Sequence, residues 1–487
     1  MSWYENAVFY ELYTRSFKDG NKDGFGDFLG AYEKLDYLAE LGIDAVWFPP
    51  FYASPLRDGG YDISDYRAID ERYGTFRDFE RIIRKAHALG MHIMTDLVVN
   101  HTSDEHYWFE QSRKDPSGPY GDYYVWADDD SGYAGTKIIF SDAEPSNWTF
   151  DPVRGQYYWH RFYKEQPDLN FDCPAVHREI LDIVNFWTKR GVDGFRLDAI
   201  PYLYEREGTA NESLPETHAF LADLRAHLNL NHPDVCLLAE ATSPLPENIE
   251  YFGTADKPEV QMCFNFNLTT EFFRSAGLHD GRGFAEKAAA VFGAADSLPG
   301  GAVWSNFLRN HDFLTLELVD GEERRVLSEL YAPPPPYGIG AGGIARRLGP
   351  LFGYDQKIIR ALTALLVSLP GAPCWYYGDE ILMADDPSLP DRDSVRLPLP
   401  WEKVAADAAD PDSFLNWFRQ TLAYRKTRPA LLFGDFEVLG AAGAGVQGAA
   451  SAAGGEPKEL FRFKRTTSAG DTVTFMIDFR TFEYSWS

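Results

Sequence analysis

Residues 92–101 read H-I-M-T-D-L-V-V-N-H, an apolar and β-branched run that ends in the polar pair Asn100 and His101. Such a run predicts a buried strand, and residues 76–89 before it carry apolar side chains at helical spacing. The same alternation predicts eight strands, at residues 8–14, 43–48, 92–99, 194–198, 235–240, 261–266, 303–308 and 372–377, and further helices at 30–41, 178–190 and 218–230. Eight strand–helix units indicate an α/β fold, a closed (β/α)8 barrel of parallel strands.

Two parts of the chain depart from this alternation. Residues 101–172, rich in Trp, Tyr, Asp and Gly, are too long for one connecting helix and predict a subdomain inserted after the third strand. From about residue 428, apolar and polar residues alternate, which predicts a small C-terminal antiparallel β domain. The expected domains are the barrel at 1–100 and 173–427, the insertion at 101–172 and the β domain at 428–487. We also expect a lid or a disordered connector at 319–354 and a flexible loop at 440–457.

The composition is that of a folded globular protein and argues against two classes of partner. Of the 487 residues, 45% are apolar and 25% are charged, and the net charge of −28 disfavours binding to nucleic acid and to membrane surfaces. The four cysteines form no C-x-x-C pair, the N-terminus does not read as a signal peptide, and no apolar run reaches 18 residues. We therefore expect a cytoplasmic protein with reduced thiols.

Polar side chains recur where the predicted strands end. The third strand leads to Asn100 and His101, the fourth ends in R-L-D at 196–198, the fifth ends in Glu240, and the seventh is followed by N-H-D at 310–312. A single Asp after a strand is usually the N-cap of the next helix, but four strand ends do not share that explanation. Two carboxylic acids at one barrel mouth suffice for cleavage of an acetal.

Four short segments carry a family resemblance. D-L-V-V-N-H (96–101), G-F-R-L-D-A (194–199), L-L-A-E-A (237–241) and N-H-D (310–312) resemble, in order and spacing, the signature regions of glycoside hydrolase family 13, the α-amylase family. The resemblance implies a TIM barrel with an inserted domain B and a β domain C. It implies that Asp198 is the nucleophile, Glu240 the general acid/base and Asp312 a third carboxylate that holds sugar hydroxyls. The subsite around the reacting glucosyl unit would be lined by His101, Arg196 and His311.

Two further residues would bind the glucose at the non-reducing end. Asp62 in G-Y-D-I-S-D-Y resembles the residue that holds this glucose in exo-acting members of the family. Its partner there is the Arg of a segment R-T-P-M-Q-W, which reads R-L-P-L-P-W here, at 396–401. The resemblance therefore predicts that Asp62 and Arg396 form a charged bar across the glucose pocket.

Two sets of oxygen ligands predict structural calcium. In D-G-N-K-D-G-F-G-D (19–27), Asp19, Asn21, Asp23 and Asp27 alternate with the Phe25 carbonyl, as in the first part of an EF-hand loop. Gly30 at the twelfth position excludes a true EF-hand, and an acidic turn without a metal is the alternative. By resemblance to trehalose synthases of the family, a second calcium would be held by Asn100, Asp168, Tyr202, Leu203 and Glu205, Tyr202 and Leu203 acting through their carbonyls. A hydrogen-bonded junction between barrel and insertion is the alternative there.

The remaining motifs favour one activity within the family. S-N-W-T-F-D-P (146–152), P-D-L-N-F-D (167–172) and P-Y-L-Y-E-R-E-G-T (201–209) most resemble the trehalose synthases, which isomerise maltose to trehalose. This implies a retaining α-glucosyl enzyme that hydrolyses some substrate; an α-glucosidase or α-amylase-type hydrolase is the alternative. Small α-glucosides are the expected partners, namely maltose, trehalose, sucrose and malto-oligosaccharides. A catalytically dead barrel that only binds carbohydrate is disfavoured, because all three acids are present. Monomer and homo-oligomer both stay open.

Overall fold

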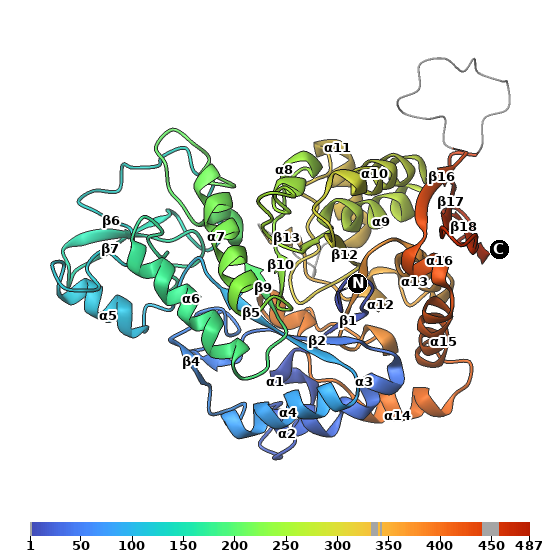
Figure 1. Ribbon diagram of the computed structural model, residues 1–487, viewed down its shortest axis with the longest axis horizontal. Coiled ribbons are helices and arrows are strands. Elements are labelled where there is room, and N and C mark those ends of the chain that lie inside the picture. Colours follow the sequence, from blue (N-terminus) through green and yellow to red (C-terminus); the bar gives the residue numbers. More distant parts are fainter. Residues whose placement is uncertain (1, 333–338, 341–342, 441–456) are drawn as a thin grey trace.

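Eight parallel strands form a closed barrel in the computed structural model, which describes residues 2–332, 339–340, 343–440 and 457–487 (Figure 1). The barrel strands are β1 (Phe9–Glu11), β2 (Ala45–Phe48), β5 (His92–Val98), β9 (Gly194–Asp198), β10 (Cys236–Ala239), β11 (Met262–Phe264), β12 (Val303–Phe307) and β15 (Ala372–Tyr376). Neighbours in this order pair in parallel, and β15 closes the ring on β1. The predicted (β/α)8 barrel is confirmed, and each observed strand lies within its predicted range.

The barrel strands are buried along nearly their whole length because both of their faces are covered. In β9, all five residues are buried. Phe195 and Leu197 pack outward against the helices. Arg196 lies beside Leu238 of β10 and Asp96 of β5 in the strand register, so it faces the barrel interior. A parallel barrel buries its strands on both sides, and this explains the continuous runs in the sequence.

Helices connect the strands and form the outer layer. The first are α1 (Thr14–Phe17), α2 (Phe28–Glu33), α3 (Leu35–Leu41), α4 (Phe76–Ala88), α6 (Pro174–Thr188), α7 (Pro215–Asn231), α8 (Leu245–Glu250), α9 (Phe266–Leu278) and α10 (Arg282–Gly293). The capping box of Thr75 and Asp78 fixes the start of α4, as its sequence favours. The helix predicted at 30–41 is wrong in one respect: it is two helices, because the backbone leaves the helical conformation at Lys34.

The later part of the barrel contains more helix than predicted. Its elements are α11 (Gly321–Tyr331), β13 (Ile339–Gly340), β14 (Gly343–Ile344), α12 (Leu348–Leu351), α13 (Gln356–Ser368), α14 (Trp401–Ala409), α15 (Phe414–Thr427) and α16 (Pro429–Phe433). Short 3-10 turns are η1 (Ile200–Tyr202), η2 (Ala295–Ser297), η3 (Asp379–Ile381) and η4 (Asp391–Val395). The segment 319–354, expected to be a lid or disordered connector, contains α11, which is capped by the Asp320 side chain. None of the described helices is long and apolar enough to cross a bilayer.

A small aromatic subdomain interrupts the barrel between β5 and α6. It contains α5 (Tyr107–Lys114) and a three-stranded antiparallel sheet of β6 (Trp126–Ala127), β7 (Trp148–Asp151) and β8 (Gln156–Trp159). Phe109 stacks on Trp126 with ring centroids 5.5 Å apart. Aromatic rings bury a large apolar area, so a few of them suffice for the core of a short segment. A two-stranded ribbon of β3 (Tyr52–Ala53) and β4 (Asp65–Ile69) lies before it in the chain. The predicted insertion is confirmed, while its exact bounds of 101–172 stay a prediction.

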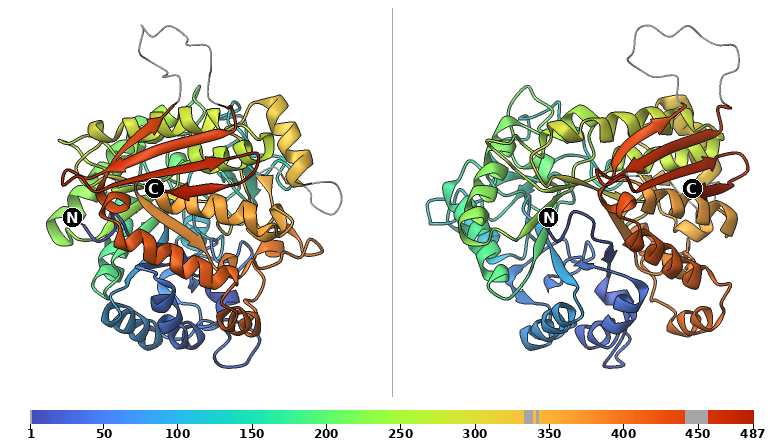
Figure 2. Two further views of the ribbon diagram at one scale, coloured as in Figure 1. Left: turned by 90° about the vertical axis from the view of Figure 1, so that its right-hand side faces the viewer. Right: turned by 45° about the vertical axis from the view of Figure 1, so that its right-hand side comes forward.

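The C-terminal part is a four-stranded antiparallel sheet of β16 (Asp435–Leu439), β17 (Leu460–Thr466), β18 (Thr472–Asp478) and β19 (Tyr484–Trp486). Figure 2 shows this sheet lying across the helices of the barrel. The ring of Phe461 in β17 lies 5.0 Å from that of Phe284 in α10, so alternate residues of the strand bury one face against the barrel. The loop predicted at 440–457 falls almost entirely at 441–456, outside the described residues.

Candidate active site

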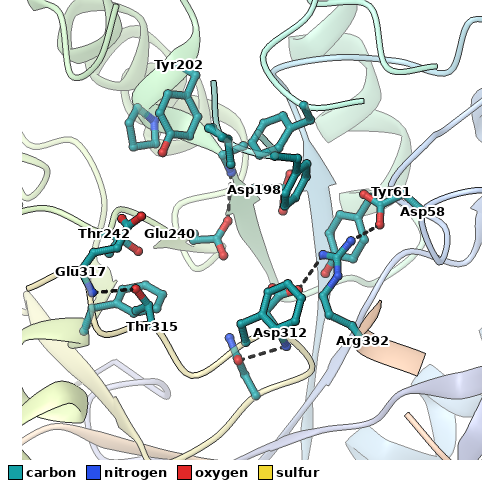
Figure 3. Close-up of a pocket in the computed structure, with 18 of the residues that line it drawn as sticks. Asp58, Tyr61, Asp198, Tyr202, Glu240, Thr242, Asp312, Thr315, Glu317 and Arg392 are labelled. Atoms are coloured by element: carbon teal, nitrogen blue, oxygen red, sulfur yellow. Dashed lines mark hydrogen bonds and ion pairs between the residues drawn. The ribbon is translucent and has the colours of Figure 1, made fainter. Parts of the chain in front are cut away.

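The predicted carboxylates meet in one pocket at the carboxyl ends of the strands (Figure 3). Asp198 is the last residue of β9, Glu240 directly follows β10, and Asp312 lies on the loop after β12. All three line a cavity of about 180 Å³. Its volume is below the roughly 300 to 1,000 Å³ common for ligand pockets, which favours a small substrate.

Arg196 is the charge that organises the pocket floor. Its side chain has no exposed surface, and Nη1 contacts Asp96 Oδ1 at 2.6 Å and also bonds to Asp198. Nη2 lies 2.5 Å from Glu240 Oε1, although this contact lacks hydrogen-bond alignment. One guanidinium thus contacts three carboxylates, which compensate its buried charge.

The surroundings divide the protons unequally between Asp198 and Glu240. Burial raises the pKa of Asp198 and of Glu240 to about 7 each, against the opposing pull of Arg196. Asp198 has the aligned hydrogen bond from Arg196, whereas Glu240 accepts one from the backbone N–H of Ala199 at 3.1 Å. A hydrogen bond from a cation favours the ionised form, so Asp198 is the better anion and Glu240 the better proton donor.

Asp312 has the opposite character and stays ionised. Burial disfavours its charge, but His311, Arg392 and Arg396 outweigh burial and hold its pKa below the ordinary value. Arg392 Nη1 lies 2.9 Å and Arg396 Nη2 3.2 Å from Asp312 Oδ1, and His311 Nε2 lies 3.1 Å from Oδ2. A permanent carboxylate of this kind accepts hydrogen bonds from sugar hydroxyls.

The two predicted histidines differ in their access to the cavity: His101 lines it and His311 lies behind the lining residue Tyr61. His311 is fully buried, stacks on Tyr61 with ring centroids 5.3 Å apart, and its Nδ1 lies 2.5 Å from Glu11 Oε1. His101 lines the cavity itself, and burial lowers its pKa to about 4. Both rings are therefore neutral at neutral pH, since burial also lowers the pKa of His311.

Comparisons with known proteins agree with this geometry. The family model described as "Alpha amylase, catalytic domain" matches residues 11–329. The trehalose synthase/amylase TreS of Mycolicibacterium smegmatis is 46% identical over 471 residues, which cover 90% of this chain and 79% of that protein. The chain belongs to the α-amylase family, glycoside hydrolase family 13. The family that the four short motifs indicated is thereby confirmed.

Two more distant relatives show how the family's activities are distributed around this chain. The oligo-1,6-glucosidase of Parageobacillus thermoglucosidasius is 30% identical, over 90% of this chain and 86% of that protein. The solved structure of the α-glucosyl transfer enzyme XgtA has a TM-score of 0.79 at 30% identity and covers 98% of this chain and 91% of that chain. Of the two relatives compared by sequence, the one named for trehalose synthesis is the more similar, and the oligo-1,6-glucosidase has lower identity.

The prediction that Asp62 and Arg396 form the charged bar across the glucose pocket is wrong. Asp62 is fully buried, and its carboxylate accepts hydrogen bonds from Ser54 Oγ at 3.0 Å and from two backbone N–H groups of its own loop. Arg396 is buried behind the pocket, where its Nε donates to the His311 carbonyl at 3.0 Å. Both side chains serve as internal supports and neither lines the cavity.

Asp58 and Arg392 form the bar instead. Both line the cavity, and Arg392 bonds to Asp58 through Nη2 and to Asp312 through Nη1 (Figure 3). The loop between Asp58 and the predicted Asp62 turns at Gly59 and Gly60, both at positive φ, so the earlier carboxylate is the one presented to the pocket. Motif position alone did not show which Asp the turn exposes.

Two other supporting residues were missed by sequence analysis. Glu11 is the final residue of β1, whereas the first strand was predicted to run to residue 14, which placed Glu11 in its middle. Gln166 lies in the P-D-L-N region, and its amide nitrogen is 3.0 Å from Asp58 Oδ2 and 3.2 Å from His101 Nε2. Its position directly before the motif P-D-L-N-F-D was the sequence signal that could have identified it.

The first candidate calcium loop is held together by its own hydrogen bonds. The Asp19 carboxylate accepts from the backbone N–H groups of Lys22 and Gly24, at 2.5 and 2.9 Å, and these bonds lower its pKa. Asp27 caps α2 and also accepts from Gly20 and Asn21. Asn21 Oδ1 and Asp23 Oδ1 likewise accept from backbone N–H groups two residues ahead. These oxygen atoms are of the types that bind calcium, but in the structure they accept hydrogen bonds that stabilise the turn.

The second candidate calcium site consists of buried carboxylate and amide oxygens. Asn100 Oδ1 and Asp168 Oδ2 are buried and make no hydrogen bond within the described part of the chain. Burial raises the pKa of Asp168 to about 8, and burial together with Asp168 raises that of Glu205 well above its ordinary value. Tyr202 and Leu203 stand between these carboxylates in the chain. Two buried carboxylates and an orphan amide oxygen fit a hard cation, although no group of three or more His, Cys, Asp or Glu side chains among the described residues is arranged to hold a metal.

Proposed function

We propose that this protein converts maltose to trehalose by intramolecular transfer of an α-glucosyl unit, with some hydrolysis. The observation that carries the proposal is the contact of one buried Arg196 with both Asp198 and Glu240, which makes the two acids face one reaction centre. The 46% identity to the trehalose synthase/amylase of M. smegmatis supports this choice of reaction over others in the family.

The reaction begins with formation of a glucosyl enzyme. Asp198 attacks the anomeric carbon as the bond to the glycosidic oxygen breaks, and Glu240 gives its proton to that oxygen. Retaining enzymes place the two carboxyl groups about 5 to 5.5 Å apart, and contact with one guanidinium favours such a short separation. Arg196 stabilises the ionised nucleophile before attack.

The glucosyl unit is held on the side of the pocket that carries fixed charge. Asp312, kept ionised by Arg392 and Arg396, is suited to bind the sugar hydroxyls together with His101. Asp58 and Arg392 close this side, so a chain extended at the non-reducing end meets an ion pair. Maltose and trehalose fit these limits best. Sucrose shares the terminal glucosyl group, while longer malto-oligosaccharides would have to extend on the other side.

Isomerisation then requires that the released glucose turns and attacks before water does. Its 1-hydroxyl bonds to the anomeric carbon as the bond to Asp198 breaks, and Glu240 takes the hydroxyl proton. Water exclusion favours this course. Simple α-glucoside hydrolysis is the second candidate, supported by the 30% identity to an oligo-1,6-glucosidase.

We also propose structural calcium at one or both candidate sites. The set of Asn100, Asp168 and Glu205, with the carbonyls of Tyr202 and Leu203, has the stronger support, because two of its oxygens are otherwise unpaired. The loop of Asp19, Asn21, Asp23, Phe25 and Asp27 has suitable ligand types only. A cation at the second set would neutralise two buried carboxylates and join the barrel to the insertion.

We propose a reducing, cytoplasmic location as well. Cys173, Cys236, Cys263 and Cys374 are all free, and the last three are buried. Free thiols in this number favour a reducing compartment. Their buried positions also argue against a catalytic role for the thiols.

Carbon NMR of a maltose incubation tests the function directly. The proposal predicts an α,α-1,1 linked disaccharide as the dominant product, with a minor fraction of glucose. Glucose without any trehalose would assign the protein to the hydrolases. The Asp198→Asn variant should give neither product, which controls for contaminating enzymes.

A further inference from the structure

Four buried side chains beside the pocket are joined by a continuous chain of hydrogen bonds. Glu11 Oε1 lies 2.5 Å from His311 Nδ1. His311 Nε2 lies 2.7 Å from the Tyr61 hydroxyl, which in turn lies 3.4 Å from Asp96 Oδ2. Asp96 contacts Arg196 through its other oxygen at 2.6 Å. The chain therefore connects the end of β1 with the guanidinium that contacts both catalytic acids.

The direction of this hydrogen-bond chain depends on the proton of the imidazole ring. A neutral imidazole has one N–H, so His311 donates either from Nδ1 or from Nε2. If Glu11 is ionised, Nδ1 donates to it and Nε2 must accept from Tyr61. If Glu11 is protonated, it donates to Nδ1 and Nε2 donates to Tyr61. In the second case the Tyr61 hydroxyl can donate to Asp96.

The surroundings of Glu11 favour its protonated form. The side chain has no exposed surface, and its Oε2 has no hydrogen-bond partner among the residues that the structure describes. A buried carboxylate with an unpaired oxygen is costly, whereas a neutral carboxyl group is less so. Burial raises the pKa of Glu11 well above its ordinary value, and the charges of Asp312 and Asp96 act in the same direction against Arg196.

The other side of the imidazole ring favours the same tautomer. His311 Nε2 lies 3.1 Å from Asp312 Oδ2, and Arg392 and Arg396 keep this carboxylate ionised. A bare Nε2 would place its lone pair against the negative charge, whereas an N–H at this position is attracted to it. Both nitrogens of the ring therefore favour a proton on Nε2.

We propose that Glu11 is a protonated positioning residue, which sets the tautomer of His311 and thereby the direction of the whole hydrogen-bond chain. Glu11 donates to His311 Nδ1, His311 Nε2 donates to Tyr61, and Tyr61 donates to Asp96. No proton leaves this chain during the reaction, and Glu11 does not touch the sugar. Its role is to fix which partner donates and which accepts beside the pocket.

This direction has a consequence at the reaction centre. Asp96 Oδ2 accepts from the Tyr61 hydroxyl and also from Trp47 Nε1 at 2.7 Å. Donors to a carboxylate favour its ionised form, and an ionised Asp96 holds Arg196, which also bonds to Asp198. The inference rests on the proposed function in one respect, namely that Asp198 acts as the nucleophile.

Nitrogen NMR of the full chain, grown with isotope-labelled histidine, measures the tautomer directly. A ring nitrogen that carries a proton differs in chemical shift from one that does not, and the signals of His311 are those missing from His311→Asn. At neutral pH we expect a proton on Nε2 only, in the wild type and in Glu11→Gln. A proton on Nδ1 only, or on both nitrogens, would overturn the inference. This result does not depend on which product the enzyme makes.

Kinetics on 4-nitrophenyl α-glucoside compare two substitutions of Glu11. Methionine has a similar length but donates no hydrogen bond, so kcat/KM of Glu11→Met should fall about five- to hundredfold. The amide of Glu11→Gln can donate to Nδ1, so this variant should recover kcat/KM to about a third of the wild-type value or more. Should Glu11→Met fail to fold, the tautomer in the wild type still decides.

Glu380 provides a matched control. It is equally buried, its Oε2 also has no hydrogen-bond partner in the described part of the chain, and its Oε1 accepts from Tyr10 and Tyr37 outside the cavity. Glu380→Met should lower the melting temperature and leave kcat/KM within about twofold of the wild type. Equal losses in Glu11→Gln and Glu11→Met, or the same loss in Glu380→Met, would overturn the inference. Because an isomerase and a hydrolase both cleave this substrate, absence of trehalose from maltose would refute the proposed function alone.

Discussion

The two sides of the active-site pocket are held in place by very different forces. On the glucosyl side, Asp312 lies among Arg392, Arg396 and His311, all of them buried. On the acceptor side, which is lined by Thr242, Thr315 and Glu317, the charged contact is the half-exposed pair of Lys137 and Glu317. Buried charge fixes geometry strongly, whereas exposed pairs contribute little. We therefore expect the pocket to bind the glucosyl unit tightly and to let the released glucose reorient, as isomerisation requires.

The largest expected effect comes from the residue between the two sides. Glu240→Gln keeps the shape of the side chain but removes the proton donor, so kcat/KM on maltose should fall by about 10² to 10⁴-fold. With 4-nitrophenyl α-glucoside the loss should be at least tenfold smaller, because nitrophenolate leaves without a proton. Steady-state kinetics on both substrates check this. Equal losses would mean that Glu240 acts elsewhere in the reaction.

The glucosyl side should be more sensitive to mutation than the acceptor side. Arg392→Met leaves Asp58 and Asp312 buried without this partner, and KM for maltose should rise about 30-fold or more, since truncating a buried charged partner costs about 2 to 5 kcal/mol. Arg57→Met is the control, because Arg57 pairs with Asp104 and Glu105 at 41% exposure outside the cavity. A KM for maltose no higher than that of Arg57→Met would contradict the role given to Arg392.

The pH dependence should be a narrow bell. Activity needs Asp198 ionised and Glu240 protonated, and burial raises the pKa of both to about 7. Protonation of the nucleophile therefore lowers kcat/KM below pH 7, and loss of the Glu240 proton lowers it above, by roughly tenfold per pH unit on each limb. The profile of kcat/KM between pH 5 and 9 measures this. A flat profile across that range would contradict the raised pKa values of the two buried acids.

The smallest expected effect is on thermal stability. It comes from the candidate calcium site next to the glucosyl side. Asp168 pairs with His101 in an isolated β-bridge, so a cation held by Asp168 and Glu205 would support that wall. A chelator should then lower the melting temperature by about 5 °C, as expected for a ligand well above its Kd. Asp23→Asn and Asp168→Asn separate the two loops: the variant that abolishes the chelator shift marks the occupied site. No shift in the wild type, with no metal found by elemental analysis, would exclude both.

The sequence predicted the barrel because buried parallel strands leave an unmistakable pattern. Residues 194–198 are apolar apart from Arg196 and Asp198, and these two are the residues that serve the pocket. The three acids could be found because each lies at or just after a strand end. Asp58 could not be separated from Asp62, because a turn at Gly59 and Gly60 decides which carboxylate faces the cavity. Partners across the fold, such as Lys137 and Glu317, leave no local signal at all.

The central claim is that Asp198 and Glu240, joined by Arg196, perform a retaining transfer. Proton NMR recorded in the first minutes of 4-nitrophenyl α-glucoside hydrolysis identifies the anomer released before mutarotation. We expect α-glucose as the first product, because two inversions at the anomeric carbon restore the original configuration. The β anomer as the first product would show a single displacement by water, and Asp198 could not then be the nucleophile.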